Sequence, residues 1–232
     1  MGIRRGSIST PIIADGLVFN MDAANRASTI PSTNTTKTFN TIDTTISGSF
    51  INDTMYDSST VSPSYAFDGT ADYIYVYDND ILKPTNVTCF CWFKGGSQTS
   101  YSYPLSKYYS GGSNAYGFYT GATPNKLYFY VKTSGGSVQT SVSGVVMDST
   151  WRLAVGSYDG TTAKLYINGI LTTTGTGTAG DIEYNNGPLT IGSFNAGLYA
   201  FNGNIGPVHI YNRALSSTEV LHNYNALKSR FE

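Results

Sequence analysis

Apolar and polar residues alternate along much of the chain, a pattern typical of half-buried β-strands. The clearest example is residues 151–169, where two alternating arms flank a tight turn at Asp159-Gly160. Each arm places its apolar residues on one face, with Leu153 in the first arm and Leu165 in the second. The segment therefore predicts a β-hairpin that has one side suited to a sheet core.

Similar alternation recurs at short intervals over the rest of the sequence. Ser, Thr, Asn and Asp dominate residues 26–62, so this segment is expected to form long loops with one or two edge strands. Residues 95–126 are also expected to be mainly loop, with a short strand at 115–120. This spacing is typical of an antiparallel sandwich. The predicted strands lie near residues 17–22, 64–68, 73–76, 87–94, 115–120, 126–132, 137–143, 151–158, 163–167, 170–174, 188–192 and 204–211.

Only the C-terminal segment departs from the strand pattern. Ser216 and Glu219 have the spacing of a capping box, and Val220, Leu221 and Tyr224 follow at helical intervals. One short C-terminal helix is therefore predicted to close an all-β, two-sheet antiparallel sandwich.

The chain carries little charge for its length. Charged residues make up 12% of the sequence, whereas about 25% is usual in soluble domains. The formal net charge is -1, and basic residues are not clustered beyond the pair Arg4-Arg5, so the basic footprint of a nucleic-acid-binding protein is absent. No apolar run approaches the ~18 residues of a membrane helix, and the first residues lack the apolar core of a signal peptide. Neither a nucleic acid nor a membrane is expected as a partner.

The two cysteines, Cys89 and Cys91, lie two residues apart in one predicted strand. Side chains with this spacing leave the strand on the same face and run parallel, which does not suit a disulfide. A zinc site would need about four ligands, and no Cys-His cluster accompanies them. Both thiols are therefore predicted to be buried apolar groups.

Catalytic groups are sparse. Glycosidases use two carboxylates about 5–9 Å apart. Glu183, Glu219 and Glu232 are the only glutamates, and none belongs to a Glu-x-Asp-x-Glu motif on a strand. His209 and His222 accompany no nucleophile motif. The protein is therefore predicted not to be an enzyme.

Four segments carry a resemblance to a known family. They are residues 67–73, residues 87–94 with their Trp, the 151–169 hairpin, and residues 205–216, which end in Tyr-Asn-Arg-Ala-Leu-Ser. Together they resemble the laminin-G-like group of the concanavalin-A-like lectin/glucanase superfamily, over about residues 16–228. The resemblance implies a jelly-roll sandwich at residues 16–232, behind an N-terminal arm at residues 1–15.

The same resemblance implies a calcium site built from Asp side chains and backbone carbonyls. Asp22, Asp68 and Asp72 are the candidate ligands, with Asp78 and Asp80 behind them. An alternative remains open, because Asp at turns also caps backbone amides without a metal.

A second candidate site is an aromatic segment within residues 101–119. Tyr, Ser, Gly and Asn are the residues that binding loops use for both glycans and proteins, so a glycan site, a protein interface and a plain exposed loop all remain open. Trp92 and Trp151, by contrast, are expected to anchor the core. The candidate ligand-binding residues are Tyr101, Tyr103, Tyr108, Tyr109, Asn114 and Tyr116.

We therefore predict a non-enzymatic virion protein, a phage capsid-decoration, fibre or tail component whose lectin-like sandwich also holds host-surface glycans. Resemblance to single-domain phage virion members and the absence of a signal peptide favour this function. Residues 2–13 would dock onto other virion proteins in a particle assembled in the host cytoplasm, and a homo-oligomer would suit such an appendage. The alternative is an extracellular carbohydrate-binding adhesion module of a cellular protein.

Overall fold

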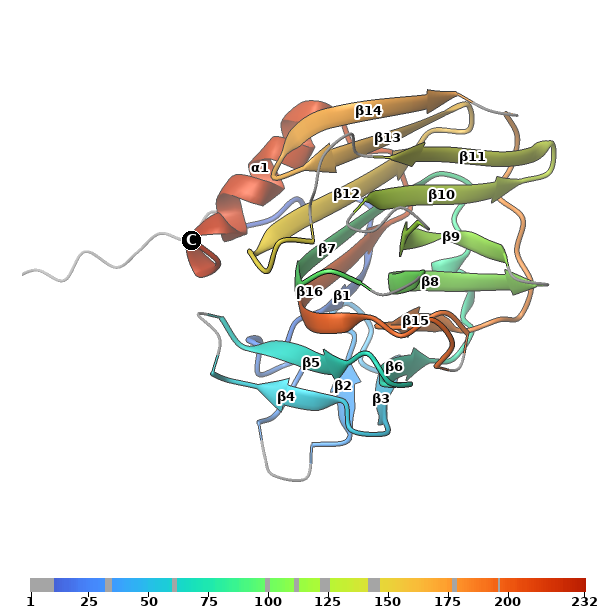
Figure 1. Ribbon diagram of the computed structural model, residues 1–232. Helices are drawn as coiled ribbons and strands as arrows, with labels where there is room; N and C mark the ends of the chain where they lie inside the picture. Colours follow the sequence, from blue (N-terminus) through green and yellow to red (C-terminus); the bar gives the residue numbers. More distant parts are fainter. Residues whose placement is uncertain are drawn as a thin grey trace, which may run out of the picture.

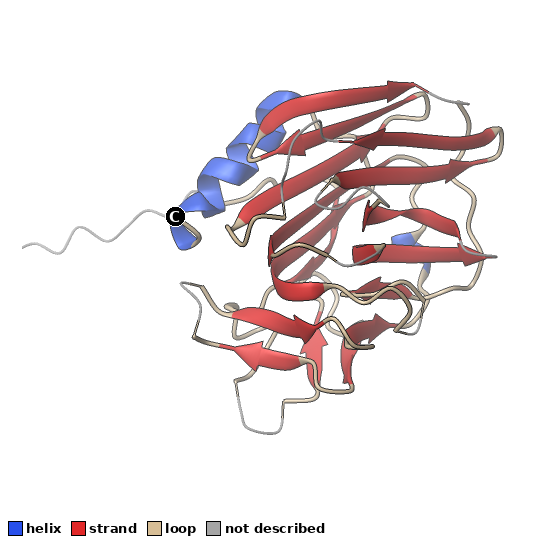
Figure 2. Cartoon of the chain, in the orientation of Figure 1, coloured by secondary structure: helices blue, strands red, loops and turns tan. Residues whose placement is uncertain are grey.

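The fold is a sandwich of two antiparallel sheets with one short helix, as a computed structural model of the chain shows (Figures 1 and 2). The two-sheet architecture and the C-terminal helix predicted from the sequence are both confirmed. The structure describes residues 11–31, 35–59, 62–98, 101–110, 113–121, 126–141, 147–176, 179–195 and 197–232.

Sheet A contains the predicted hairpin. Its strand order is β14 (Ile170–Thr176), β13 (Thr162–Ile167), β12 (Arg152–Tyr158), β7 (Val87–Gly95), β16 (Asn202–Tyr211), β5 (Ser64–Asp68) and β4 (Met55–Asp57), with β1 (Leu17–Met21) also paired to β16. In the hairpin, β12 and β13 pair from Ala154 opposite Ile167 to Tyr158 opposite Ala163. Gly160 has a φ of 94°, the left-handed conformation that the tight turn requires.

Sheet B packs against sheet A. Its order is β11 (Gly136–Ser141), β10 (Leu127–Thr133), β9 (Ser113–Thr120), β8 (Ser102–Ser110), β15 (Leu189–Ile191), β6 (Tyr73–Val76), β3 (Ser47–Ile51) and β2 (Lys37–Phe39). A single 3-10 turn, η1 (Asp80–Leu82), follows β6. The prediction that residues 95–126 are mostly loop is wrong, because β8 and β9 occupy most of this segment. In the described part of residues 26–62, three short strands form rather than one or two.

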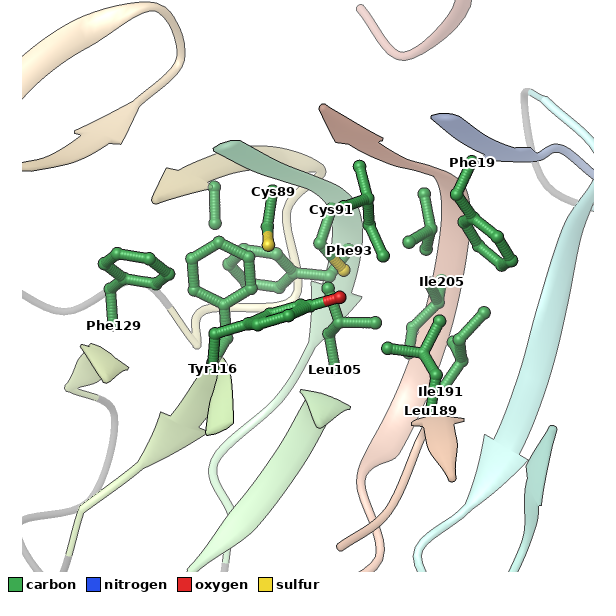
Figure 3. Packing of buried hydrophobic residues seen from close by; sticks show 14 of the residues in the cluster. Phe19, Cys89, Cys91, Phe93, Leu105, Tyr116, Phe129, Leu189, Ile191 and Ile205 are labelled. Carbon is green, nitrogen blue, oxygen red and sulfur yellow. The ribbon is translucent and has the colours of Figure 1, made fainter. Parts of the chain in front are cut away.

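The core lies between the sheets and is filled by residues from both (Figure 3). Cys89, Cys91 and Phe93 of β7 point from sheet A toward Leu105 and Tyr116 of sheet B. Both thiols are free and buried, as predicted, and burial raises the pKa of Cys89 well above its usual range.

The opposite face of sheet A carries a second apolar layer under the C-terminal segment. Helix α1 (Ser217–Leu227) begins at the predicted capping box, in which Glu219 N donates to Ser216 Oγ at 3.3 Å, and a 3-10 turn, η2 (Lys228–Arg230), follows it. Trp92 of β7 stacks on Phe231 with ring centres 4.2 Å apart and on Tyr224 at 5.8 Å. Trp92 is thus a core anchor, as predicted.

The segment from residue 11 to residue 15, the end of the predicted arm, lies against the same layer. Ile13 N donates to Asn223 Oδ1 at 2.8 Å, and Tyr211 Oη donates to Ile13 O at 2.8 Å. Residues 1–10, which contain most of the predicted docking segment, lie outside the described residues. Helix α1 spans 11 residues, and no helix in the described part of the chain is long and apolar enough to cross a membrane.

One buried glycine allows the two sheets to approach each other. A methyl group on Gly156 of β12 would overlap the ring of Phe129 on β10. We expect Gly156→Ala to lower the free energy of unfolding by about 1–3 kcal/mol, because the packed core cannot absorb the added volume. Urea denaturation would measure the loss, and the double variant with Phe129→Leu should lose less than the sum of the single variants. Strict additivity would contradict this contact.

Candidate functional site

A polar hollow of about 240 Å³ lies at the rim where the ends of several strands meet. The turn after β5 forms one side, the segment after β7 forms another, and the starts of β8 and β16 complete it. The sheet topology brings these segments together, because β16 lies between β5 and β7 and pairs Asn202 with Asp68. The lining residues are Asp68, Gly69, Thr70, Ser97, Gln98, Tyr101, Ser102, Ala200 and Asn202.

Gln98 fixes one wall of the hollow. Its Nε2 donates to Gly96 O at 2.8 Å and to Asn202 O at 3.0 Å, while its Oε1 accepts from Asn202 N at 3.0 Å. The buried amide is therefore fully used in holding the segment after β7 to the start of β16. Asn202 keeps its own side chain exposed to solvent, with no hydrogen-bond partner among the described residues.

Two carboxylates at the β5–β6 turn have different roles. Asp72 is buried, and its oxygens accept from Asp53 N at 3.0 Å and from Asp68 N at 3.1 Å. Burial, assisted by the neighbouring charge of Asp68, raises the pKa of Asp72. Asp68 is exposed and lines the hollow, with one oxygen accepting from Thr70 N at 2.6 Å. Asp72 thus supports the turn, and Asp68 faces the solvent.

The other predicted calcium ligand, Asp22, is already occupied. Its two oxygens accept from Arg230 Nη1 and Nη2 at 2.8 Å each, a bidentate pair that ties the C-terminus to β1. Asp78 pairs with Lys83 at 2.6 Å and with Lys107 at 2.7 Å. Nowhere in the described ranges do three His, Cys, Asp or Glu side chains gather as a metal ion would require. The aspartates predicted as calcium ligands therefore do not gather into one site in the described residues. Calcium binding itself stays a prediction.

A row of stacked tyrosines starts beside the hollow and crosses the outer face of sheet B. We define the tyrosine row as Tyr101, Tyr103, Tyr119 and Tyr128. Tyr103 stacks on Tyr119 with ring centres 5.5 Å apart, and Tyr119 stacks on Tyr128 at 4.9 Å. Tyr101 is 41% exposed, lines the hollow and contacts Tyr119 at 6.2 Å. Partial burial raises the pKa of Tyr103 from 10 to about 12.

The structure separates the six predicted ligand-binding residues. Tyr116 is buried in the core and donates to Leu82 O at 3.0 Å, and Asn114 is buried and accepts from Ser106 Oγ at 2.6 Å. Neither can meet a ligand at the surface, because both side chains point inward from strands rather than outward from loops. Tyr108 is half-buried against Phe194 at 5.4 Å. The side chain of Tyr109 lies outside the described residues.

Several residues of the site were not predicted from the sequence. Tyr119 and Tyr128 were not candidates, although each alternates with a buried phenylalanine in its strand. That alternation is a signal for an outward-facing side chain. Gln98 and Asn202 gave no such signal, since their roles depend on contacts between distant strands.

A family model described as the concanavalin A-like lectin/glucanases superfamily matches residues 68–221, more than half of the chain. The chain belongs to this superfamily. The match includes the hollow, from Asp68 through Gln98 to Asn202, and the whole tyrosine row. No curated protein sequence matches the chain.

Several solved structures share this lectin-like fold. The binding domain of Paraclostridial Mosquitocidal Protein 1 is similar with a TM-score of 0.68 and 15% identity, over 91% of this chain and 52% of that one. The receptor binding domain of botulinum neurotoxin C/D mosaic serotype has a TM-score of 0.67 and 11% identity, over 92% of this chain and 52% of that one. This lectin-like chain therefore spans about half the length of those toxin domains.

Domain 4 of AbnA, a GH43 extracellular arabinanase from Geobacillus stearothermophilus, matches along nearly its full length. Its structure, in complex with arabinotriose, has a TM-score of 0.61 and 18% identity, over 90% of this chain and 98% of that one. An enzyme is similar as well. Trypanosoma rangeli sialidase has a TM-score of 0.67 and 12% identity, over 97% of this chain and 36% of that one. At these identities the similarity shows the fold of this superfamily member and nothing finer.

Proposed function

We propose that this domain binds glycans in the rim hollow. The observation that carries the proposal is the combination of an exposed amide, hydroxyls and a carboxylate with an exposed aromatic ring in one small concavity. A sugar ring offers hydroxyls that need donors and acceptors, and a C–H face that packs on apolar surface. Asn202, Asp68 and Thr70 would meet the hydroxyls, and Tyr101 would pack against the ring.

Two of the similar structures support a glycan as the ligand. The arabinanase domain is in complex with arabinotriose, and a binding domain of botulinum neurotoxin DC is in complex with SialylT. A sandwich of two sheets clusters its loops at the ends of the strands, and the hollow described above lies at such a rim.

We propose binding without catalysis. Both oxygens of Asp72 accept backbone N–H groups, so this carboxylate serves the turn rather than a bound sugar. Asp68 then stands in the hollow without a second free carboxylate among the residues that line it. Glycoside hydrolysis in most families needs such a pair.

Asn202→Ala is expected to weaken glycan binding about tenfold, the effect of losing roughly one hydrogen bond to a positioned ligand. A glycan-array screen of the purified protein would first identify binders, and titration of the best binder would compare the variants. Asn225→Ala, which removes an exposed amide on α1, is the matched control and should bind like the unaltered protein. An array without binders, obtained with folded protein, would overturn the proposal. A parallel array in EDTA would test the calcium prediction.

Carriage on a virus particle stays a prediction from the sequence. A particle-borne domain and an extracellular adhesion module would display the same hollow, so the proposed glycan site is compatible with both. Other virion proteins and a homo-oligomer likewise stay predictions.

A further inference from the structure

We propose that the ligand is a linear, uncharged oligosaccharide of several units, with one unit in the hollow and the following units along the tyrosine row. This inference rests on the proposed function and adds the class of glycan and a second part of the site.

The hollow alone is too small for an oligosaccharide. Pockets that enclose a drug-sized ligand start at about 300 Å³, whereas this hollow measures about 240 Å³. It can therefore take about one ring-sized unit. Any further unit of the same chain must lie on the neighbouring surface.

The tyrosine row is the surface that continues from the hollow. Tyr101 belongs to both, since it lines the hollow and contacts Tyr119. Tyr119 and Tyr128 lie directly opposite each other in the β9–β10 pairing, and Tyr103 lies on the adjacent strand β8. Because neighbouring strands are about 4.8 Å apart, the row extends the site by roughly 10 Å across three strands.

The rings of the row are held in place before any ligand arrives. Tyr103 packs between Tyr119 at 5.5 Å and Phe194 at 4.9 Å, and a methyl group on Gly121 would overlap the ring of Tyr128. Gly121 thus lets the Tyr128 ring lie against the backbone. A ligand that binds to such fixed rings pays little side-chain entropy.

The free groups along the site suit uncharged sugars. Within the described part of the chain, the hydroxyls of Tyr101, Tyr103 and Tyr119 have no hydrogen-bond partner, so they can serve sugar hydroxyls. The residues that line the hollow include no Lys or Arg, and they do include the Asp68 carboxylate. An acidic sugar there would meet like charge without a cation to balance it.

The test is an NMR titration of the full chain with uncharged gluco- and arabino-oligosaccharides of one to five units, with sialyllactose as the acidic comparison. Affinity in the better uncharged series should rise at least tenfold from one unit to four. Tyr119→Ala should remove most of that gain and leave the affinity for one unit within about twofold. Tyr77→Ala, at an exposed tyrosine of the same chain away from the row, is the matched control.

The outcomes separate the two proposals. Equal affinity for one and for four units, or an unchanged gain in Tyr119→Ala, would overturn the role of the row and leave the hollow as a glycan site. Tighter binding of sialyllactose would overturn the uncharged class. No binding of any sugar would overturn both proposals. If Tyr119→Ala does not fold, Gly121→Ala, whose methyl group would overlap the ring of Tyr128, tests the row at the neighbouring tyrosine and should also reduce the gain.

Discussion

Replacing Trp92 with alanine should lower the free energy of unfolding by about 3–5 kcal/mol, the usual cost of deleting a large buried aromatic side chain. The Trp92 side chain is 2% exposed and stacks on both Phe231 and Tyr224. Removing it would leave a cavity between β7 and the C-terminal layer. Urea denaturation followed by circular dichroism would measure the change.

Two further variants make this test specific. Tyr77→Ala removes an aromatic side chain that is 73% exposed, so it should change the unfolding free energy by no more than about 0.5 kcal/mol. Trp92→Phe should cost less than Trp92→Ala, because phenylalanine keeps an aromatic ring against Phe231 and Tyr224. The exchange loses no hydrogen bond, since the indole Nε1 has no partner among the described residues. A loss below 1 kcal/mol in Trp92→Ala would show that the C-terminal layer adds little to the stability of the sandwich.

Stability should also fall by about 3 kcal/mol as the pH drops from about 6.5 to about 4, because of His209. Burial lowers the pKa of this histidine from 6.5 to about 4, an effect that Arg230 reinforces and Asp22 opposes. The unfolded chain therefore binds a proton in this window that the folded chain excludes. Each pH unit then removes up to about 1.4 kcal/mol. Above pH 6.5 this stabilisation is fully present.

Denaturation curves at several pH values would test this expectation. His209→Leu should flatten the dependence between pH 6.5 and 4, and it should cost little at pH 7 because the buried Nδ1 has no hydrogen-bond partner in the described part of the chain. His222→Gln removes the other histidine and is the control. If the free energy of unfolding of His209→Leu fell as steeply between pH 6.5 and 4, the acid sensitivity would come from other groups.

The elements that the sequence predicted best have an uninterrupted pattern. The 151–169 hairpin alternates and β7 is a nearly unbroken apolar run, so the buried positions of Leu153 and Trp92 could be deduced before the structure was known. The alternation did not reveal that β7 and β12 are buried on both faces, between sheet B and the C-terminal layer. Strand β8 could not, because its pairing with β9 shifts register between Ser102 and Leu105 and again near Tyr108. Such bulges break the period of two on which strand prediction relies.

The candidate site was predicted only in part for a related reason. Tyr101 and Tyr103 do lie at the site, whereas Tyr116 does not, because side chains in one strand alternate between core and surface. The walls of the hollow depend on long-range pairing, since Gln98 and Asn202 are 104 residues apart. The pair of Asp22 and Arg230 spans 208 residues, and no local pattern links them.

The path of β16 has a practical consequence for how the domain can be attached to a surface. The strand starts at Asn202 beside the hollow and ends at Tyr211, where Ile13 and α1 pack. Nine residue steps of extended chain separate those ends by about 30 Å. A tether attached at residue 11 would therefore join the domain beside α1, away from the hollow. Protein immobilised by such a tether would stand with its hollow facing the solution, which is the orientation that captures ligands on a sensor.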